Sequence, residues 1–293
     1  MPKNIIGLDI GATKIRIGLI SKQFKVIKKQ TFPTPKKAAD VLSAISYGIE
    51  KLYSGEIEKI GLGVAGQIDQ KKNLVNFSTN FPQGLNDVPL KKILEEKFKY
   101  PVFIDNDAHC FALGEAIAGQ GKKFNFIIGV TLGTGIGGGI IIDKKVLKGK
   151  NNTAGEIGHQ IIKVNGRKCD CGKSGCFEAY ASGSAMVKSY KKLSGQDKDT
   201  FEIEQLFIKG EENAKLVVEE SSHYLAIGLS NLINILNPEA IVLGGGLSNF
   251  KKFIDLAKSE INKYLITPHL KQTPILISKL NDNAGMIGAS LLK

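Results

Sequence analysis

The sequence predicts an α/β protein made of two domains of the same plan that face each other across a central cleft. Its 293 residues, 42% of them hydrophobic, are enough for two buried cores. Apolar segments follow one another in strand, strand, helix, strand order, and this order begins again near residue 125. Each half also carries a Gly turn after its first strand, so a polyphosphate gripped between the halves is expected.

The first half begins with strands around a tight loop and continues as alternating helices and strands. Apolar periodicity predicts its strands at 3–9, 15–20, 25–32, 57–64 and 102–104, and its helices at 38–52, 90–98 and 108–118. We therefore expect a small N-terminal α/β domain over residues 1–118.

The second half repeats this order around a cysteine-rich insertion at about 155–178. Its strands are expected at 125–132, 136–142, 240–243 and 275–278, its helices at 213–236, 250–265 and 284–292, and a polar surface loop at 193–199. We expect a larger C-terminal domain over residues 119–293. Its last helix, about 283–293, is expected to pack back on the N-terminal domain.

Composition excludes several classes of protein. The net charge is +12, but the lysines are scattered in short pairs and Trp is absent, so we expect no nucleic-acid partner. The uncharged stretch 126–142 is too short and too rich in Gly for a membrane span. The N-terminus leads directly into an apolar strand and shows no signal peptide, so a cytoplasmic protein without a membrane partner is expected.

A Gly loop, residues 9–14, joins the first two predicted strands (the first Gly loop). Gly11 at its tip brings backbone N–H groups close to a ligand, and Thr13 and Lys14 are able to donate to phosphate oxygens. Asp9 is able to hold a metal ion through water. The alternative is an ordinary hairpin turn in which Asp9 and Thr13 only close the bend.

A second Gly loop, residues 132–139, formally contains the dinucleotide pattern GxGxxG at Gly133, Gly135 and Gly138. That pattern should open a helix, whereas residues 140–142 are isoleucines that continue a strand. A complete Walker A motif is also absent. The glycine run 244–246 ends a strand before a helix, where an adenosine or merely a tight turn would fit.

Asp105, Asn106 and Asp107 follow a short strand and precede a helix. An Asp in this place is often only a helix N-cap. The functional interpretation is a general base that accepts a hydroxyl proton during phosphoryl transfer, kept ionised by the helix N-terminus. Asn106 beside it is able to donate to and accept from sugar hydroxyls.

The cysteine-rich insertion predicts a structural zinc site. Cys169, Cys171 and Cys176, with His159 upstream, form a Cys₃His set that suits a closed tetrahedral site. The alternative is three free thiols. Glu156, His159 and Glu178 surround this cluster, and two carboxylates with an imidazole are suitable partners for a polyol. The alternatives are a solvated Glu178 and a hydrogen-bonded core His159.

Together these segments resemble the ROK family of sugar kinases and repressors, within the actin/hexokinase-like (ribonuclease H-like) superfamily. The resemblance covers residues 5–292. Its most specific parts are the segments 156–159 (EIGH) and 169–178 (CDCGKSGCFE), which look like the family's sugar-binding and zinc signatures. The first Gly loop, the second Gly loop and the Asn106–Asp107 pair match further motifs of the family.

The resemblance implies a kinase that transfers the γ-phosphate of ATP, with Mg²⁺, to a hexose-type sugar, usually at C6, and that is commonly a homodimer. Asp107 is then the catalytic base. The implied sugar contacts are Gly66, Asn80, Asn106, Asp107, Glu156, His159 and Glu178. The implied nucleotide contacts are Asp9, Gly11, Thr13, Lys14, Gly133, Thr134, Gly135, Gly137 and Gly245. His159, Cys169, Cys171 and Cys176 are the implied zinc ligands, with the second ring nitrogen of His159 towards the sugar.

Some alternatives remain open at this point. His109 and Leu85 depart from the usual residues of the family near the expected sugar pocket. The choice of sugar therefore stays open among glucose, an N-acetylated hexosamine such as N-acetylglucosamine or N-acetylmannosamine, mannose and fructose. A non-catalytic sugar sensor and a polyphosphate-dependent kinase are further alternatives. We expect no DNA-binding domain before the first strand, which disfavours a repressor.

Overall fold

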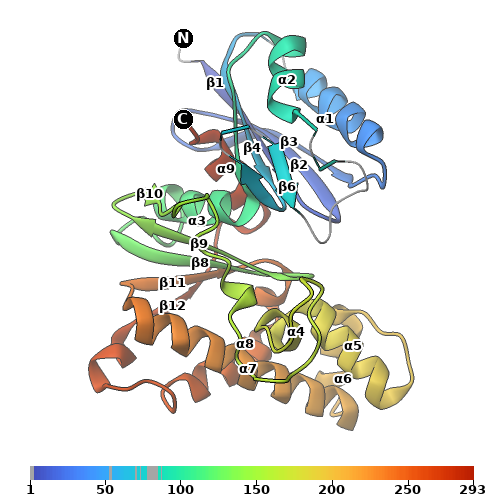
Figure 1. Ribbon diagram of the computed structural model, residues 1–293, viewed down its shortest axis with the longest axis vertical. Helices are drawn as coiled ribbons and strands as arrows, with labels where there is room; N and C mark the ends of the chain where they lie inside the picture. The colour runs from blue at the N-terminus through green and yellow to red at the C-terminus, as the bar shows by residue number, and fades with distance from the viewer. Residues whose placement is uncertain (1–2, 53–54, 70, 73, 78–84, 87) are drawn as a thin grey trace. The chain divides into compact units, whose positions relative to one another are not determined.

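The chain forms two five-stranded sheets, seen in the computed structural model of Figure 1. The structure describes residues 3–52, 55–69, 71–72, 74–77, 85–86 and 88–293. The first sheet consists of β1 (Asn4–Ile10), β2 (Lys14–Ile20), β3 (Val26–Pro33), β4 (Ile57–Val64) and β7 (Val102–Asn106). The second consists of β8 (Phe126–Leu132), β9 (Ile136–Ile142), β10 (Lys145–Val146), β11 (Ala240–Gly244) and β12 (Ile275–Ile277).

Both sheets have the same topology. The strand orders are β3-β2-β1-β4-β7 and β10-β9-β8-β11-β12, so each half places its third, second, first, fourth and fifth strands side by side. In the first sheet β3, β2 and β1 pair antiparallel, whereas β1, β4 and β7 are parallel. This repetition confirms the duplicated α/β plan predicted from the sequence. A separate hairpin pairs β5 (Gln67–Asp69) with β6 (Leu74–Phe77).

The chain divides into two compact units. Unit 1 contains Met1–Gly129, Gly139–Gly155 and Ser278–Lys293, and unit 2 contains Val130–Gly138 and Glu156–Ile277. Strands β8 and β9 contribute residues to both. The domains expected at residues 1–118 and 119–293 stay a prediction. They were defined by the repeated order of elements, whereas the two units are defined by compactness.

Helices cover both faces of the first sheet within unit 1. They are α1 (Ala38–Leu52), α2 (Leu90–Phe98), α3 (Asp107–Ala118) and α9 (Ala284–Ser290). Helix α1 contacts β2 and β3 and α2 contacts β7, whereas α9 packs on β1 and β4 and against α3. Apolar side chains of the strands fill the layer under α1 and α2, where Ile6, Leu8 and Ile17 are fully buried.

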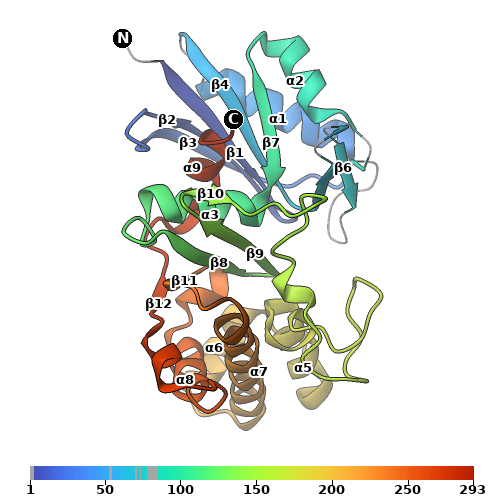
Figure 2. The ribbon, with the colours of Figure 1, turned by 60° about the vertical axis from the view of Figure 1, so that its left-hand side comes forward.

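Helix α9 approaches the sheet so closely that two strand positions must be Gly. A Cβ atom on Gly7 would lie 2.1 Å from the carbonyl oxygen of Met286, and one on Gly61 would lie 1.8 Å from that of Ala289. Figure 2 shows α9 beside β1. The two glycines therefore let the end of the chain pack directly on β1, which leads into the first Gly loop, and on its neighbour β4.

Unit 2 is mainly helical beyond its strands. Its helices are α4 (Glu178–Ala181), α5 (Gly183–Ser194), α6 (Thr200–Ile208), α7 (Glu212–Leu236) and α8 (Lys251–Ile261). Helix α7 contacts all four others, and Figure 2 shows α7 and α8 side by side. Its short 3₁₀ turns are η1 (Ile157–His159), η2 (Gly246–Asn249) and η3 (Pro268–Gln272), whereas η4 (Asn281–Asn283) belongs to unit 1. None of the helices among the described residues combines the length and hydropathy needed to cross a membrane.

Several elements were not predicted. The hairpin β5–β6 and strand β10 are too short to show periodicity, and α5 and α6 follow the cysteine-rich insertion without a long apolar repeat. The helix expected at 250–265 ends at Ile261, since the chain turns after Asn262. The loop expected at 193–199 begins only after Ser194, where Gly195 adopts a positive φ of 72° and ends α5.

Candidate functional site

The junction of β7 and α3 carries the predicted base and its neighbour. Asn106, and not an Asp, is the N-cap of α3, because its side chain accepts hydrogen bonds from the backbone N–H groups of Ala108 (2.9 Å) and His109 (3.1 Å). Its amide nitrogen donates to the carbonyl oxygen of Gly66 (3.0 Å). The structure therefore brings Gly66 and Asn106 together, and one N–H of the Asn106 amide remains for a further partner.

Asp107 is the first residue of α3 and is half-buried. One of its carboxylate oxygens accepts a hydrogen bond from the backbone N–H of Ala108 (2.9 Å). Its position in the first turn of a 12-residue helix favours the ionised carboxylate through the helix dipole. Asp107 is also close enough to Asp9 for its charge to raise the pKa of Asp9.

The first Gly loop is closed by hydrogen bonds that include an unpredicted residue. The backbone N–H of Gly11 donates to the carbonyl of Lys14 (3.0 Å). Thr34, which follows β3, donates its hydroxyl to the carbonyl of Gly11 (2.7 Å) and its N–H to that of Thr13 (3.0 Å). Thr13 and Lys14 are exposed, as phosphate-binding residues would be. No sequence pattern singles out Thr34, which lies 23 residues after Gly11.

Asp9 lies at the end of β1 and is largely buried, with 17% of its side chain exposed. Burial, together with the negative charge of Asp107, raises the pKa of Asp9 to about 7. Arg16 opposes this shift, because its guanidinium lies 3.1 Å from the Asp9 carboxylate and also pairs with Asp282 (2.9 Å). A Cβ atom on Gly285 would lie 2.9 Å from the Asp9 carboxyl carbon, so α9 lines this carboxylate.

In unit 2, the second Gly loop is held by the start of α5. The backbone N–H groups of Gly183 and Ser184 donate to the carbonyls of Gly133 (2.8 Å) and Thr134 (3.2 Å). Gly133 in turn donates to the carbonyl of Gly135 (3.0 Å). The loop conformation is therefore set by a helix that follows it by 50 residues in the sequence. Gly137 lies in β9, and its N–H donates to the hydroxyl of Thr131 (3.2 Å).

Gly245 follows β11 and lies against β8. Its φ of 82° is in the left-handed region, and a Cβ atom there would be 2.4 Å from the carbonyl oxygen of Leu132. Its own carbonyl accepts hydrogen bonds from the N–H and the hydroxyl of Ser248. A residue with a side chain is therefore excluded from this turn by both conformation and space.

The four predicted zinc ligands are brought together in unit 2. The ligand atoms of His159, Cys169, Cys171 and Cys176 all lie within 4.8 Å of one another. Nδ1 of His159 is 3.7 Å from Sγ of Cys169, and Sγ of Cys171 is 3.7 Å from that of Cys176. With Zn–S bonds of about 2.3 Å, ligand atoms at the corners of a tetrahedron lie about 3.7 Å apart. The residues therefore fit a four-coordinate zinc ion.

Glu178 connects this cluster to the second Gly loop. One oxygen of its carboxylate accepts the backbone N–H of Ile136 (2.7 Å), and the other lies 3.8 Å from Sγ of Cys169. Glu156 is exposed, and its carboxylate lies 3.9 Å from Nε2 of His159. The ring of His159 thus presents Nδ1 to the cysteines and Nε2 to Glu156. The zinc and sugar roles that the family resemblance implies for His159 stay predictions.

Three further residues complete the comparison. Asn80 lies outside the described residues. His109 and Leu85 were expected near the sugar pocket, but His109 is 3% exposed with both ring nitrogens hydrogen-bonded, and Leu85 belongs to the buried core of unit 1. Their expected place near the sugar pocket stays a prediction.

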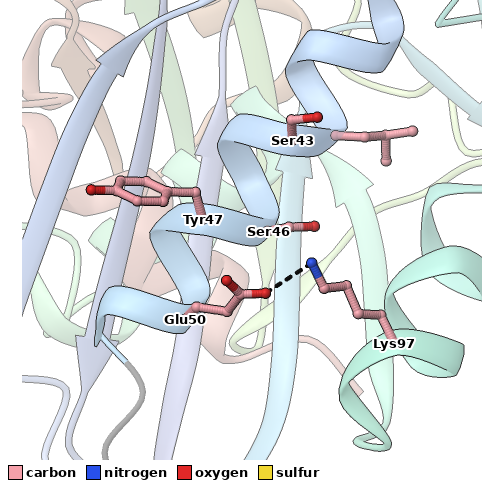
Figure 3. A pocket seen from close by; sticks show the side chains of 6 residues that line it. Ser43, Ser46, Tyr47, Glu50 and Lys97 are labelled. Atoms are coloured by element: carbon pink, nitrogen blue, oxygen red, sulfur yellow. Dashed lines mark ion pairs between the residues drawn. The ribbon is translucent and has the colours of Figure 1, made fainter.

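A pocket of about 300 Å³ lies elsewhere, between α1 and α2 (Figure 3). Its lining includes Ser43, Ser46 and Tyr47, and Glu50 pairs with Lys97 across it at 2.8 Å. None of the predicted site residues lines this pocket. Its walls are mainly polar and exposed, whereas ligand pockets are usually apolar with few convergent polar groups. We therefore assign it no function.

Known proteins resemble this chain along nearly its whole length. The N-acetyl-D-glucosamine kinase of Vibrio atlanticus is 35% identical over 299 residues, which cover 98% of both chains. The glucokinase of Thermotoga maritima is 33% identical over 309 residues, which cover 99% of this chain and 97% of that protein.

Solved structures agree. The crystal structure of a ROK family glucokinase from Streptomyces griseus in complex with glucose and AMPPNP superposes with a TM-score of 0.89 at 30% identity, covering 99% of both chains. The ROK family model matches residues 5–293. The topology, the Cys₃His cluster and these matches lead to one conclusion: the chain belongs to the ROK family.

Proposed function

We propose that this protein is an ATP-dependent kinase that phosphorylates a hexose-type sugar at its 6-hydroxyl group. The observation that carries the proposal is Asp107, a half-buried carboxylate on the first turn of α3 beside the capping residue Asn106. Relatives that match nearly the full length are named glucokinases and N-acetyl-D-glucosamine kinases. An N-acetylglucosamine or N-acetylmannosamine kinase is the alternative, and a non-catalytic sugar sensor is the second one.

In the proposed mechanism Asp107 accepts the proton of the attacking sugar hydroxyl. A general base must be ionised and correctly aimed, and the helix N-terminus supports the first condition. The direction in which the Asp107 carboxylate points depends on the junction of β7 and α3. The proposed sugar contacts are Gly66, Asn80, Asn106, Glu156, His159 and Glu178. Asn106 has one amide N–H left for a sugar oxygen, after its bonds to the helix and to Gly66.

The phosphates of ATP are proposed to bind the two Gly loops. In the first loop the exposed Thr13 and Lys14 and the N–H groups near Gly11 would donate to phosphate oxygens. In the second, the proposed contacts are Gly133, Thr134, Gly135 and Gly137, and the adenosine would lie against Gly245. Asp9 would hold Mg²⁺ through water, and the ion would neutralise charge on the transferred phosphoryl group.

Zinc is proposed to be structural. Four protein ligands leave no open coordination position, so the Cys₃His site would hold the loop that carries Glu156 and Glu178. His159 would give Nδ1 to the metal and Nε2 to the sugar, which the 3.7 Å and 3.9 Å distances of these two atoms support.

The raised pKa of Asp9 makes a prediction about pH. Asp9 is only about half ionised at pH 7, because burial and the charge of Asp107 raise its pKa to about 7. The carboxylate form is needed to hold Mg²⁺, so kcat/KM for Mg-ATP should rise as the pH increases through about 7. Arg16→Gln removes the charge that lowers this pKa. For each further unit by which the pKa of Asp9 rises in this variant, kcat/KM at pH 7 should fall about fivefold. The difference from the wild type should be smaller at pH 9.

The control for this prediction is Arg16→Lys, which keeps a positive charge near Asp9 and should retain most of the activity at pH 7. Melting temperatures of both variants identify any loss of folding. A pH profile of Arg16→Gln that superposes on that of the wild type would contradict the role given to Asp9.

The proposed activity is tested by ADP release from zinc-replete protein with Mg-ATP. The panel contains glucose, N-acetylglucosamine, N-acetylmannosamine, mannose and fructose. Turnover with glucose well above the rest supports the main proposal, and turnover with an acetylated sugar supports the alternative kinase. If sugars raise the melting temperature without turnover from ATP or from polyphosphate, the protein is a sensor.

We also propose that the protein is a cytoplasmic homodimer, as is common in the family. Light scattering coupled to size exclusion would report a mass near twice 31.7 kDa. A mass of one chain at micromolar concentration would reject the dimer.

A further inference from the structure

A cluster of buried polar side chains surrounds the junction of β7 and α3. Asp105, at the end of β7, is fully buried, and His109, in the first turn of α3, is 3% exposed. Asn152 is 5% exposed and donates its amide to Asp105 (3.0 Å). Lys148, whose side chain is exposed, places its ammonium group 3.2 Å from the second oxygen of Asp105. Buried groups of this kind are rare unless they satisfy one another.

The hydrogen-bond partners fix the protonation state of His109. Its Nδ1 lies 3.0 Å from the carboxylate of Asp105, and its Nε2 lies 2.8 Å from the backbone carbonyl oxygen of Ala154. A carbonyl oxygen only accepts, so Nε2 carries a proton. Asp105 already accepts hydrogen bonds from the N–H of Asn106 (2.8 Å) and from the amide of Asn152, and its second oxygen faces Lys148. These donors indicate an ionised carboxylate. Nδ1 of His109, which faces this carboxylate, then carries a proton as well.

The His109 ring is therefore an imidazolium, although it is buried. The directions of the pKa shifts agree. Burial opposes the charge on His109, but the hydrogen bond and charge of Asp105 outweigh it, and the pKa of His109 is raised. Burial also opposes the charge of Asp105, but His109, Asn152 and Lys148 lower the pKa of that carboxyl to about 2.

The cluster joins three parts of the chain in unit 1. Asp105 belongs to β7, His109 to α3, and Lys148, Asn152 and Ala154 to the segment 148–154 that follows β10. The proposed base, Asp107, lies between Asp105 and His109 in the sequence. The segment 148–154 reaches the proposed sugar contact Glu156 after only one further residue, Gly155. Neither Gly loop takes part in the cluster.

We propose that His109, as an imidazolium, is a positioning residue for the sugar side of the reaction. Its two N–H groups tie the segment 148–154 to the β7–α3 junction, and so orient Asp107 and the chain that leads to Glu156. This inference rests on the proposed kinase function. Two charged groups act on His109. The carboxylate of Asp105 in β7 stabilises the proton on the His109 ring, and the positive charge of Lys148 disfavours that proton.

The structural half of the proposal is tested by hydrogen exchange of the segment 148–154, measured against the intrinsic rate. In His109→Gln at pH 6.5 we expect exchange about a hundredfold faster or more, since a buried charge pair has lost one partner. The matched control is His223→Gln, because His223 also pairs with a carboxylate, that of Glu260 at 2.8 Å, but in unit 2 and at the surface. Unchanged exchange in His109→Gln would overturn the proposal.

The wild-type protein supplies a test without mutation. The stabilising effect of the His109 charge is complete below pH 6.5, the ordinary pKa of His, and is lost as the pH rises through the raised pKa. The stabilising effect of the Asp105 charge is present above pH 3.8, the ordinary pKa of Asp, and is lost only as the pH falls through about 2. Protection of 148–154 should therefore fall on the alkaline side. Protection that stays constant up to pH 10 would contradict the imidazolium.

Kinetics distinguish this role from general instability. In His109→Gln we expect the KM for sugar to rise about tenfold while the KM for Mg-ATP stays within about twofold, because the cluster is joined directly to proposed sugar contacts and contains no residue of either Gly loop. Asp105→Asn with His109→Gln restores a neutral, hydrogen-bonded pair and should recover part of both the exchange protection and the sugar KM. Equal increases in both KM values would reject the positioning role. If the wild type phosphorylates no sugar, the kinase proposal fails. The exchange tests then still decide whether His109 ties the segment 148–154 to the β7–α3 junction.

Discussion

Asp107→Asn should fold normally, bind sugar, and show a kcat about 10²–10⁴ times lower than that of the wild type. The substitution removes the carboxylate that accepts the hydroxyl proton. It keeps an oxygen able to accept the N–H of Ala108, which now bonds to Asp107 at 2.9 Å, and it leaves the cap by Asn106 in place. The measurement is ADP release with the preferred sugar, alongside the sugar-induced shift in melting temperature.

The matched control is Asp40→Asn. Asp40 is also an acidic residue in the first turn of a helix, α1, but it is exposed. Both variants lose one helix-dipole interaction, which contributes about 0.3–1 kcal/mol to stability, so a comparable small change in melting temperature is expected. If kcat of Asp107→Asn stays within about threefold of the Asp40→Asn value, Asp107 is not the base.

Cys176→Ser should lose the bound metal and melt at a temperature about 10 °C or more below that of the wild type. Cys176 is fully buried, and its Sγ lies 3.7 Å from that of Cys171. The metal would cross-link the loop that leads to Glu178, whose carboxylate accepts the N–H of Ile136, so its loss should loosen this contact. We therefore expect a raised KM for sugar as well. Elemental analysis should find one zinc per wild-type chain.

Cys110→Ala is the control for this variant. Cys110 is equally buried but lies on α3, outside the Cys₃His cluster, and should leave the zinc content unchanged. Chelation of the wild type should reproduce the lower melting temperature, and added zinc should restore it. Full zinc content in Cys176→Ser, or none in the wild type, would show that the four residues are not a zinc site.

Local patterns in the sequence predicted most of the elements. The 3.6-residue periodicity of α1 and the apolar strands β1, β2 and β4 gave bounds within about one residue of the structure, because α1 buries one face and the strands are apolar runs buried on both faces. The β5–β6 hairpin, of three and four residues, offers no period to detect. Helices α5 and α6 were missed for a related reason, since packing against α7 and not their own pattern determines them.

The candidate site shows the same division. The spacing of Cys169, Cys171 and Cys176 predicted a metal site, because ligands close in sequence can reach one ion in almost any fold. The partners of Asp9 could not be found this way. Arg16 lies opposite Asp9 because β2 pairs with β1. Asp282 reaches Arg16, and Gly285 reaches Asp9, only because the last 12 residues pack on the sheet.

By itself, the sequence determined the α/β class, the duplicated order of elements, the Gly loops and the Cys₃His set, because these are recorded in local spacing. Only the tertiary structure decided that Asn106 and not an Asp caps α3. It also decided that His109 is buried, with both ring nitrogens within hydrogen-bond distance of Asp105 and Ala154. The reason is physical: a side chain's charge and availability depend on the groups around it, and those of His109 come from segments 45 residues apart.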